Sequence, residues 1–583
     1  MFEPSAFKRA VFFLIFDLLL SLFTLVIAYN LRFNFEVPVV FSENILSVFV
    51  IIAFLKIFSL YYFRIYNIAW RFFSLGEVKK IFYAHLIAYT LFTLIFYIFP
   101  NAFDPFPRSV LIIDLFLSML FIGFFRISKR LITEGKSDSN LKKTLLVGVS
   151  PFAQTLFKEQ NDFYICAVVD NSDMIVGTYF SSIRVKSFDD IGSIIKDDSI
   201  ESIVITKEFS QEVLQELYVQ FDKYNIYDIK IAILSQKNAV LKDLSIEDLL
   251  ARHPKDLDKE KIASFVEGKT ILVTGAGGSI GSEICRQCKL FGVKKLILLD
   301  NSEYNLYTIT EELSGVELVS VMQSVVNLED IKKTFAKHQP DIVIHAAAYK
   351  HVPLVEDNIE EGIVNNIIGT KNLIDTAINN GVKKVVLIST DKAVRPTNVM
   401  GTTKRICELY AQNVVSNSTE IVAVRFGNVL GSSGSVIPKF KAQIEAGKNI
   451  TVTHPDITRY FMLIPEACEL VLQAGAIGEG GEIFILDMGE PVKIVDLAQK
   501  MIDLSDRDDI NIEFTGLRPG EKLYEELLID ESDAKTDYES ITVARPTPYD
   551  IEKLNQDIDE LLRTEDKILK LKEIVPEFNH QLN

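Results

Sequence analysis

The sequence predicts an α-helical membrane domain followed by two α/β domains built on mainly parallel sheets. Of the 41 phenylalanines in 583 residues, 25 fall within the first 140 residues, which also hold four long apolar stretches. Beyond them, short β-branched strands alternate with helical segments, as in a parallel sheet. Charge divides in the same way, because the first 140 residues carry +4 and the remainder −21. A single compact domain and a disordered chain are both excluded.

The membrane domain is predicted over residues 1–135. A bilayer crossing takes about 20 apolar residues, and three of the four stretches are this long while the fourth is short. All four are apolar all round, whereas helices of a soluble bundle, the alternative, would show a polar face. Ionisable side chains inside such spans are candidates for function. The spans are expected at 10–31, 45–63, 81–99 and 110–125, and the ionisable residues are Asp17, Lys56, His85 and Asp114.

Basic residues are concentrated before the first stretch, between the second and third, and after the fourth. By the positive-inside rule, both termini and the α/β domains are expected to face the cytoplasm, with the lipid bilayer as the first partner. The residues that decide this orientation are Lys8, Arg9, Arg64, Arg71, Lys79, Lys80, Arg126, Lys129, Arg130 and Lys136.

The first α/β domain is predicted over residues 140–240. Thr144–Val147 is typical of a buried strand that turns at Gly148 into a helix, and two further apolar strands follow. A dinucleotide site needs several glycines where the backbone meets phosphate, and only Gly148 is present. This favours a degenerate Rossmann-like spacer over a nucleotide-binding domain. Residues 241–267, charged and weakly periodic, are expected to form a linker.

The second α/β domain, residues 268–583, begins with a strand and a glycine-rich turn, Gly275-Ala-Gly-Gly-Ser-Ile-Gly. Gly275 permits the tight turn, Gly278 lets the backbone approach a pyrophosphate, and Gly281 lets helix and strand pack closely. Ser279 and Ile280 stand at the N-terminus of the following helix, where phosphate charge is stabilised. The alternative is a glycine turn that serves packing alone.

Polar and small residues follow the later strands of this domain. Asp300 ends the second strand, where a carboxylate can accept from a ribose 2′-hydroxyl and would repel a 2′-phosphate, so NAD is favoured over NADP. Ala346 and Ala347 leave room for a cofactor. Thr390, Asp391 and Lys392 form a polar cluster after another strand, at the sheet edge where ligands bind; the alternative is a solvated Asp–Lys pair. The cysteines have no second Cys-x-x-Cys pair at zinc-site spacing, so no metal is expected.

Six sequence blocks occur in order between about residues 267 and 528. They are Thr274–Glu283, His345–Pro353, Ser389–Lys404, Val424–Gly431, His454–Tyr460 and Arg518–Glu521. Through these blocks the chain resembles the extended short-chain dehydrogenase/reductase family, specifically the nucleotide-sugar 4,6-dehydratases. It is most similar to the large membrane-bound UDP-N-acetylglucosamine 4,6-dehydratases of bacterial polysaccharide and protein glycosylation.

The resemblance implies a lyase that uses bound NAD to dehydrate UDP-N-acetylglucosamine at the inner membrane of a bacterium, and a homo-oligomer. It implies a small α/β substrate-binding subdomain within 268–583. The substrate site would include Lys350, Asn428, Arg459, Arg518 and Glu521, with Arg425 and Lys439 as further candidate cations. Nucleic acid is not expected as a partner, because the soluble part is acidic and has no basic stripe.

The implied reaction oxidises C4, eliminates water across C5–C6 and returns the hydride to C6. Thr390 would hydrogen-bond the C4 oxygen, Asp391 would protonate the departing C6 hydroxyl, and Lys392 would remove the C5 proton, which demands a lowered pKa. Lys404 would hold the nicotinamide ribose. Met400 stands where most relatives have the tyrosine base, and since methionine accepts no proton, Asp391 is expected to take the C4 hydroxyl proton.

Two alternatives stay open. A UDP-sugar 4-epimerase would use the same cofactor and fold without eliminating water, although such enzymes usually keep the tyrosine. A membrane scaffold would bind a nucleotide sugar without turning it over. Loss of one water from the sugar nucleotide identifies the dehydratase, isomerisation at constant mass identifies the epimerase, and no change identifies the scaffold.

Overall fold

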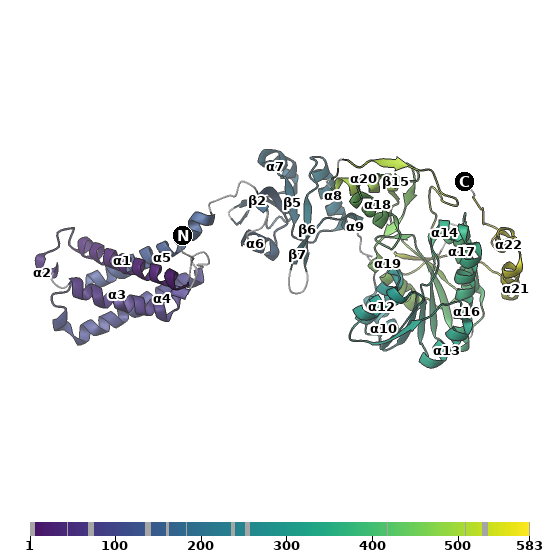
Figure 1. Ribbon diagram of the computed structural model, residues 1–583, viewed down its shortest axis with the longest axis horizontal. Coiled ribbons are helices and arrows are strands. Elements are labelled where there is room, and N and C mark those ends of the chain that lie inside the picture. The colour runs from purple at the N-terminus through teal and green to yellow at the C-terminus, as the bar shows by residue number, and fades with distance from the viewer. Residues whose placement is uncertain are drawn as a thin grey trace. The chain divides into compact units, whose positions relative to one another are not determined.

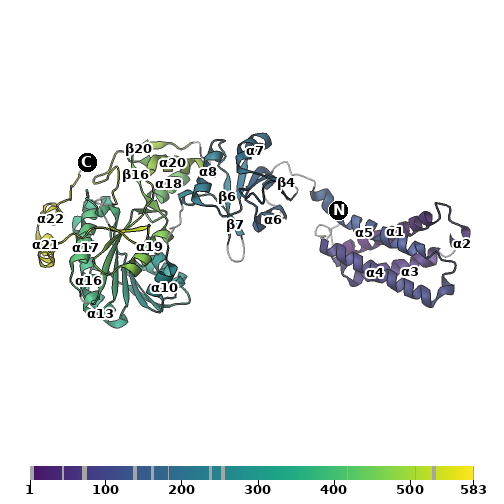
Figure 2. The same ribbon diagram turned by 180° about the vertical axis from the view of Figure 1, so that it is seen from behind.

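The computed structural model describes most of the chain, which forms two compact units, Met1–Leu141 and Lys142–Asn583 (Figures 1 and 2). Each unit is described by itself. Arg71 and Lys136, two of the residues used to predict orientation, lie outside the described residues. The described residues are 6–42, 45–67, 75–134, 141–158, 163–181, 183–234, 239–250, 257–416, 418–505, 507, 509–527 and 534–581.

Among its described residues, the first unit has four helices that are long and apolar enough to cross a membrane, in agreement with the four stretches expected from the sequence. The fourth helix is longer than its apolar stretch, because it continues in a polar segment to Glu134. Large apolar side chains remain exposed along all four helices, as expected where lipid replaces water. The helices are α1 (Ala6–Arg32), α3 (Ile45–Tyr62), α4 (Leu75–Ile98) and α5 (Ser109–Glu134), with a short α2 (Val39–Ser42).

The ionisable residues of the spans are paired inside this unit. Lys56 Nζ on α3 lies 2.9 Å from Asp114 Oδ2 on α5, and both side chains are fully buried. Arg126 Nη2 on α5 lies 2.6 Å from Asp17 Oδ2 on α1. His85 on α4 contacts a backbone carbonyl one turn earlier. Buried charges in an apolar surrounding must be paired, so the two ion pairs hold α5 against its neighbours.

The second unit begins with a sheet of seven strands in the order β3-β4-β2-β1-β5-β6-β7, formed by described residues 142–243. The central strands are parallel, and the outermost strands β3 and β7 are antiparallel to their neighbours. The strands are β1 (Lys142–Val147), β2 (Phe163–Val169), β3 (Tyr179–Phe180), β4 (Ile183–Lys186), β5 (Ser202–Ile205), β6 (Ile229–Leu234) and β7 (Ala239–Asp243). The helices are α6 (Pro151–Lys158), α7 (Ile191–Asp198) and α8 (Gln211–Asp222).

The segment expected to be a linker, 241–267, is structured at both ends. Its first residues belong to β7, which pairs with β6, and to α9 (Ile246–Leu250), which packs on α8. Its last residues form α10 (Lys259–Val266), which packs on α19 (Ile464–Ile477) of the second α/β domain. The linker prediction is therefore wrong for these two ends, since each carries apolar residues that a neighbouring core buries. Residues 251–256 lie outside the described residues.

The second α/β domain is built on a larger sheet, in which the described residues form nine strands in the order β10-β9-β8-β11-β12-β13-β18-β22-β21. In this order, β10, β9, β8, β11, β12, β13 and β18 run parallel, and β22 and β21 extend the edge in antiparallel pairing. The strands are β8 (Thr270–Thr274), β9 (Lys295–Asp300), β10 (Glu317–Met322), β11 (Ile342–His345), β12 (Lys384–Ile388), β13 (Glu420–Arg425), β18 (Ile483–Leu486), β21 (Ala534–Lys535) and β22 (Ile541–Val543).

Helices cover both faces of this sheet, as Figure 1 shows. One apolar core joins the sheet to one helix layer and a second core joins it to the other. The first layer includes α13 (Leu328–His338), α16 (Gly369–Asn379), α17 (Val399–Asn413), α21 (Ile551–Arg563) and α22 (Lys567–Ile574). The second includes α10, α11 (Ser279–Leu290), α12 (Glu303–Glu312) and α19.

A small subdomain stands beyond the carboxyl ends of the strands, as expected for the substrate side. It joins its short strands in pairs, β14 with β17, β15 with β20 and β16 with β19. Its apolar core is continuous with that of the first α/β domain, since Leu217 and Phe221 of α8 share a cluster with Leu497 and Met501. Its elements are β14 (Asn428–Val429), α18 (Val436–Glu445), β15 (Ile450–Val452), β16 (Thr458–Arg459), β17 (Phe461–Met462), β19 (Val492–Lys493), α20 (Ile494–Asp503) and β20 (Ile512–Phe514).

Candidate active site

A cleft of about 810 Å³ lies between the carboxyl edge of the large sheet and the subdomain. A smaller cavity of about 200 Å³ adjoins it and shares its glycine loop. Among the residues expected at a site, the cleft is lined by Gly275, Gly278, Ser279, Ile280, Gly281, Ala346, Lys350, Thr390, Lys392, Met400, Lys404 and Asn428. Asp300 and Ala347 line the smaller cavity. The loops after four neighbouring strands therefore bring these residues to one edge, although they are far apart in the sequence.

The glycine loop is a tight backbone cradle. Gly275 has a φ of +63°, which favours glycine, and a Cβ there would lie 2.9 Å from the Ala347 backbone nitrogen. A Cβ at Gly281 would collide with the Gly275 carbonyl oxygen, so helix α11 could not start so close to β8. A Cβ at Gly277 would lie 2.5 Å from the Asn305 backbone. The backbone of this loop is thus free to approach a phosphate, as in dinucleotide-binding folds.

Asp300 fixes the loop from the end of β9. Its Oδ2 accepts from the Gly277 backbone nitrogen at 2.9 Å, and its Oδ1 accepts from the Ser302 nitrogen at 2.9 Å. The carboxylate therefore lies at the rim of the smaller cavity, where a ribose hydroxyl would meet it.

The first α/β domain has a similar carboxylate without the cradle. Asp170, at the end of β2, accepts from the Val149 nitrogen at 2.7 Å and from the Ser172 nitrogen at 2.9 Å. At Gly148, however, a Cβ would lie 2.7 Å from Lys207 Cβ, so a side chain fills the space beside the turn. This geometry favours the interpretation of the domain as a spacer.

The polar cluster after β12 is a compact ion-paired turn. Thr390 Oγ1 donates to Asp391 Oδ1 at 2.8 Å, and Lys392 Nζ donates to the same oxygen at 3.0 Å. Lys392 also donates to Asn428 Oδ1 at 3.4 Å, and Glu525 Oε1 lies 3.9 Å from its Nζ. Asp391 is fully buried, and its second oxygen has no hydrogen-bond partner among the described residues. The turn is therefore rigid and places Lys392 at the cleft.

The lysine in this turn is charged in the free protein. Burial alone would lower the pKa of Lys392, but the carboxylates of Asp391 and Glu525 outweigh burial and raise it. The sequence analysis required a lowered pKa, and that expectation is wrong for the unliganded state. The physical reason is the pair of carboxylates: the adjacent Asp391 raises the pKa most, and Glu525, from a distant segment, adds to the rise.

Helix α17 packs directly against the turn. A Cβ at Gly401 would collide with the Lys392 carbonyl oxygen, so only glycine allows this approach. Asn398 caps the helix by accepting from the Gly401 nitrogen at 2.8 Å. Met400 lines the cleft, and Lys404 one turn later is buried, which lowers the pKa of its ammonium. Met400 thus presents a thioether to the cleft at the position where most relatives have the tyrosine base.

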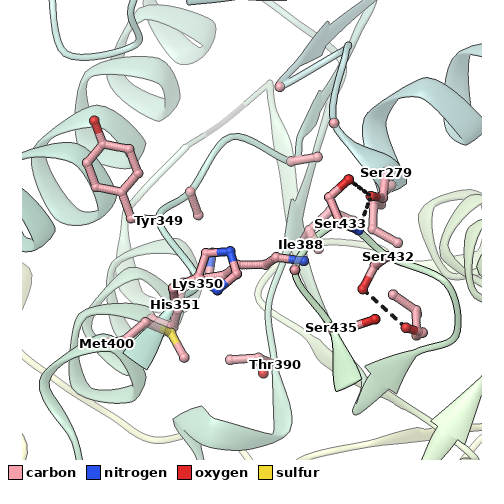
Figure 3. Close-up of a pocket in the computed structure, with 18 of the residues that line it drawn as sticks. Ser279, Tyr349, Lys350, His351, Ile388, Thr390, Met400, Ser432, Ser433 and Ser435 are labelled. Atoms are coloured by element: carbon pink, nitrogen blue, oxygen red, sulfur yellow. Dashed lines mark hydrogen bonds between the residues drawn. The ribbon is translucent and has the colours of Figure 1, made fainter. Parts of the chain in front are cut away.

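Other side chains enter the cleft from the loop after β11. In Figure 3, Lys350 and His351 lie near Met400 and Thr390. Burial lowers the pKa of Lys350, and the nearby charge of Lys392 lowers it further. On the other side, the Ser433 nitrogen donates to Ser279 Oγ at 3.2 Å and joins the subdomain to the glycine loop (Figure 3).

The candidate phosphate residues gather in a separate group. Arg459 Nη2 lies 3.5 Å from Glu521 Oε1 and 3.9 Å from Glu525 Oε1. The Arg518 nitrogen donates to Glu521 Oε2 at 3.1 Å. These three expected residues lie together, and Glu525 joins them to the turn after β12, but none of them is among the residues that line the cleft.

Arg425 is not available for a ligand. It is fully buried and its Nη2 lies 2.8 Å from Glu408 Oε2. Glu408 also accepts from Arg405 at 3.2 Å and from Ser389 Oγ at 2.7 Å. The candidate role of Arg425 as a phosphate cation is therefore wrong, since its charge is used inside the domain.

Sequence reasoning missed two polar residues of the site. Glu525 was not singled out, because nothing in its neighbourhood of alternating charged and apolar residues marks it. Asn366, in a π-helical segment, donates to the Tyr349 carbonyl at 3.0 Å and to Thr403 Oγ1 at 3.0 Å, and so joins the β11 loop to α17. The adjacent asparagines Asn365 and Asn366, in an otherwise apolar run, are the one signal that could have pointed to it.

The fold and the site define a class: a Rossmann-type domain with a dinucleotide cradle and a separate substrate subdomain, preceded by apolar helices. Residues 271–546 match the model of a family described as "Polysaccharide biosynthesis protein". The chain is 42% identical over 557 residues to the capsular polysaccharide biosynthesis protein CapD of Staphylococcus aureus, covering 91% of this chain and 92% of that one. The protein belongs to this polysaccharide biosynthesis family.

Similarity also extends to other proteins over the second α/β domain. A UDP-glucose 4-epimerase of Rickettsia rickettsii is 36% identical over 281 residues, which is 47% of this chain and 81% of the relative. A solved structure, that of Pen from Bacillus thuringiensis, is 32% identical, with a TM-score of 0.45, and covers 52% of this chain and 99% of that one.

Proposed function

We propose that the protein is an NAD-dependent UDP-N-acetylglucosamine 4,6-dehydratase that serves polysaccharide or glycoprotein biosynthesis from the cytoplasmic face of a bacterial membrane. One observation carries the proposal: Lys392, paired with Asp391 after β12, lines the same cleft as the glycine loop and Met400. An acid and a base side by side suit elimination. The role of the Staphylococcus relative in capsule synthesis agrees with a sugar nucleotide as substrate.

The cradle fits NAD. The backbone at Gly275, Gly278 and Gly281 leaves room for a pyrophosphate, and Asp300 offers carboxylate oxygens at the ribose end. Lys404, which lines the same cleft, would hold the nicotinamide ribose. Bound there, NAD would supply the reversible hydride acceptor that oxidation at C4 and reduction at C6 need.

The residues of the turn carry the proton transfers. Asp391 takes the C4 hydroxyl proton as that carbon is oxidised, while Thr390 hydrogen-bonds the C4 oxygen. The resulting ketone makes the C5 proton acidic, and Lys392 removes it. Asp391 then gives its proton to the C6 hydroxyl, which leaves as water. Lys392 finally returns its proton to C5, so both groups end as they began.

The test is replacement of Lys392. Lys392→Ala should abolish exchange of the C5 hydrogen with solvent deuterium while the purified protein still retains NAD. Lys383→Ala is the matched control, because Lys383 is exposed and lies 3.4 Å from Asp341 away from the cleft. Wild-type turnover by Lys392→Ala would refute the assigned role.

A 4-epimerase is the second candidate, because the Rickettsia relative shares this domain. Mass spectrometry of the product decides between the candidates. The dehydratase removes one water from UDP-N-acetylglucosamine, and the epimerase changes configuration at constant mass. A protein that binds the nucleotide sugar and changes nothing would be the scaffold.

A further inference from the structure

Glu525 is a buried carboxyl group between the two cations nearest to the proposed chemistry. Its Oε1 lies 3.9 Å from Lys392 Nζ and 3.9 Å from Arg459 Nη2. Only 4% of its side chain is exposed. Its Oε2 is buried and has no hydrogen-bond partner among the described residues. An ionised carboxylate with an unsatisfied buried oxygen costs free energy, so burial at this site favours the neutral, protonated acid.

The proton balance of the proposed reaction requires an acceptor for one proton of Lys392. Asp391 must begin as a carboxylate to accept the C4 hydroxyl proton, and Lys392 must begin as a neutral amine to accept the C5 proton. In the free protein Lys392 is instead an ammonium paired with Asp391. One proton must therefore leave Lys392 before the first transfer, and it must not go to Asp391.

We propose that Glu525 receives this proton and holds it during turnover, so that Lys392 becomes a neutral base without losing a proton to solvent. This inference rests on the proposed dehydratase function. The Lys392 N–H bond breaks and a Glu525 O–H bond forms. Asp391 and Lys392 then complete their cycle as described, and the proton returns from Glu525 to Lys392 when product leaves. Glu525 never touches substrate and is a positioning residue for the Lys392 proton.

The charges that face Glu525 come from three segments. Asp391 and Lys392 belong to the catalytic turn, Arg459 to β16, and Lys522 to the same loop as Glu525. Burial raises the pKa of Glu525 against the attraction of Lys392, and Asp391 adds to the rise. A diphosphate that engages Arg459 would draw away one of the three cations that stabilise ionised Glu525, which are Lys392, Arg459 and Lys522. Substrate binding would thus favour transfer of the proton at the moment when it is needed.

The pH dependence of kcat tests the proposal in the full-length holoprotein. In the wild type the resting and reactive forms hold equal numbers of protons, so kcat should be nearly flat between about pH 6 and 8. In Glu525→Gln the Lys392 proton must be lost to solvent, and kcat should rise about tenfold per pH unit. Glu525→Met, a second uncharged replacement of similar size, should give the same slope.

The neighbouring carboxylate provides the control. Glu526 pairs with Arg395 at 2.8 Å and is 40% exposed, and Glu526→Gln should keep the flat profile. Parallel profiles for wild type and both Glu525 variants, differing only in height, would reduce Glu525 to a structural role and overturn the proposal. A tenfold slope in the wild type itself would overturn it without any variant. Failure of the wild type to release water would instead reject the proposed function, and this proposal with it.

Discussion

Replacement of Glu408 by glutamine should destabilise the second α/β domain strongly. Glu408 is fully buried on α17, accepts from Arg425 at 2.8 and 3.1 Å, and also binds Arg405. The amide cannot neutralise two buried guanidinium groups, and breaking a buried ion pair costs about 3–5 kcal/mol. At roughly 2 °C per kcal/mol for a domain of this size, Tm should fall by about 6–10 °C. Differential scanning calorimetry of the full-length protein measures the change.

The control is a surface pair in the same domain. Lys295 and Glu317 lie 3.1 Å apart, with Glu317 59% exposed, so Glu317→Gln should cost at most about 1 kcal/mol. Although burial favours the protonated form, Arg425 and Arg405 hold the pKa of Glu408 below its ordinary value of 4.5. Its stabilising effect is therefore complete above pH 4.5 and is lost as pH falls through the lower folded-state pKa. Equal costs for Glu408→Gln and Glu317→Gln would refute the reasoning.

Further predictions concern packing at the cleft and in the membrane unit. Gly281→Ala should yield protein without bound NAD, measured as cofactor content, because the new methyl group collides with the loop backbone. Gly401→Ala should retain NAD but lose about 100-fold in kcat, since a displacement of about 1 Å separates α17 from the turn. Met400→Leu should keep kcat within about tenfold, because the thioether transfers no proton. Lys56→Met should lower Tm in detergent more than the double variant Lys56→Met/Asp114→Leu, which leaves no unpaired buried charge.

The dinucleotide cradle could be predicted from sequence because its requirements are local. Within one turn, glycine is needed wherever a Cβ would strike backbone, and Gly275 and Gly281 satisfy this condition. The same test distinguishes the first α/β domain, where Asp170 keeps its backbone contacts but the space beside Gly148 is filled by Lys207. The membrane helices could also be predicted from the sequence, because a span that is apolar on every side is recognised from its composition alone.

What could not be predicted depends on long-range pairing. Arg425 has the residue type of a phosphate ligand. Only the packing of α17 against β13 shows that Arg425 forms a buried ion pair with Glu408. Glu525 lies far along the chain from Lys392, yet the fold brings it close enough to raise the pKa of that lysine. Both errors have one cause: a sequence shows which residues can ionise but not which of them share a buried environment.

The arrangement of these charges explains how an acidic protein can bind an anion. The chain has a net charge of −17, yet Lys350, Lys392 and Lys404 line the cleft, with Glu361 as its one carboxylate among the described residues. Asp391 and Glu525 are buried beside Lys392, where their carboxyl groups stabilise its positive charge. The local field should therefore attract a diphosphate, and the Kd for UDP should rise with salt as screening increases. A Kd measured by calorimetry that falls with salt would show that the net charge governs binding instead.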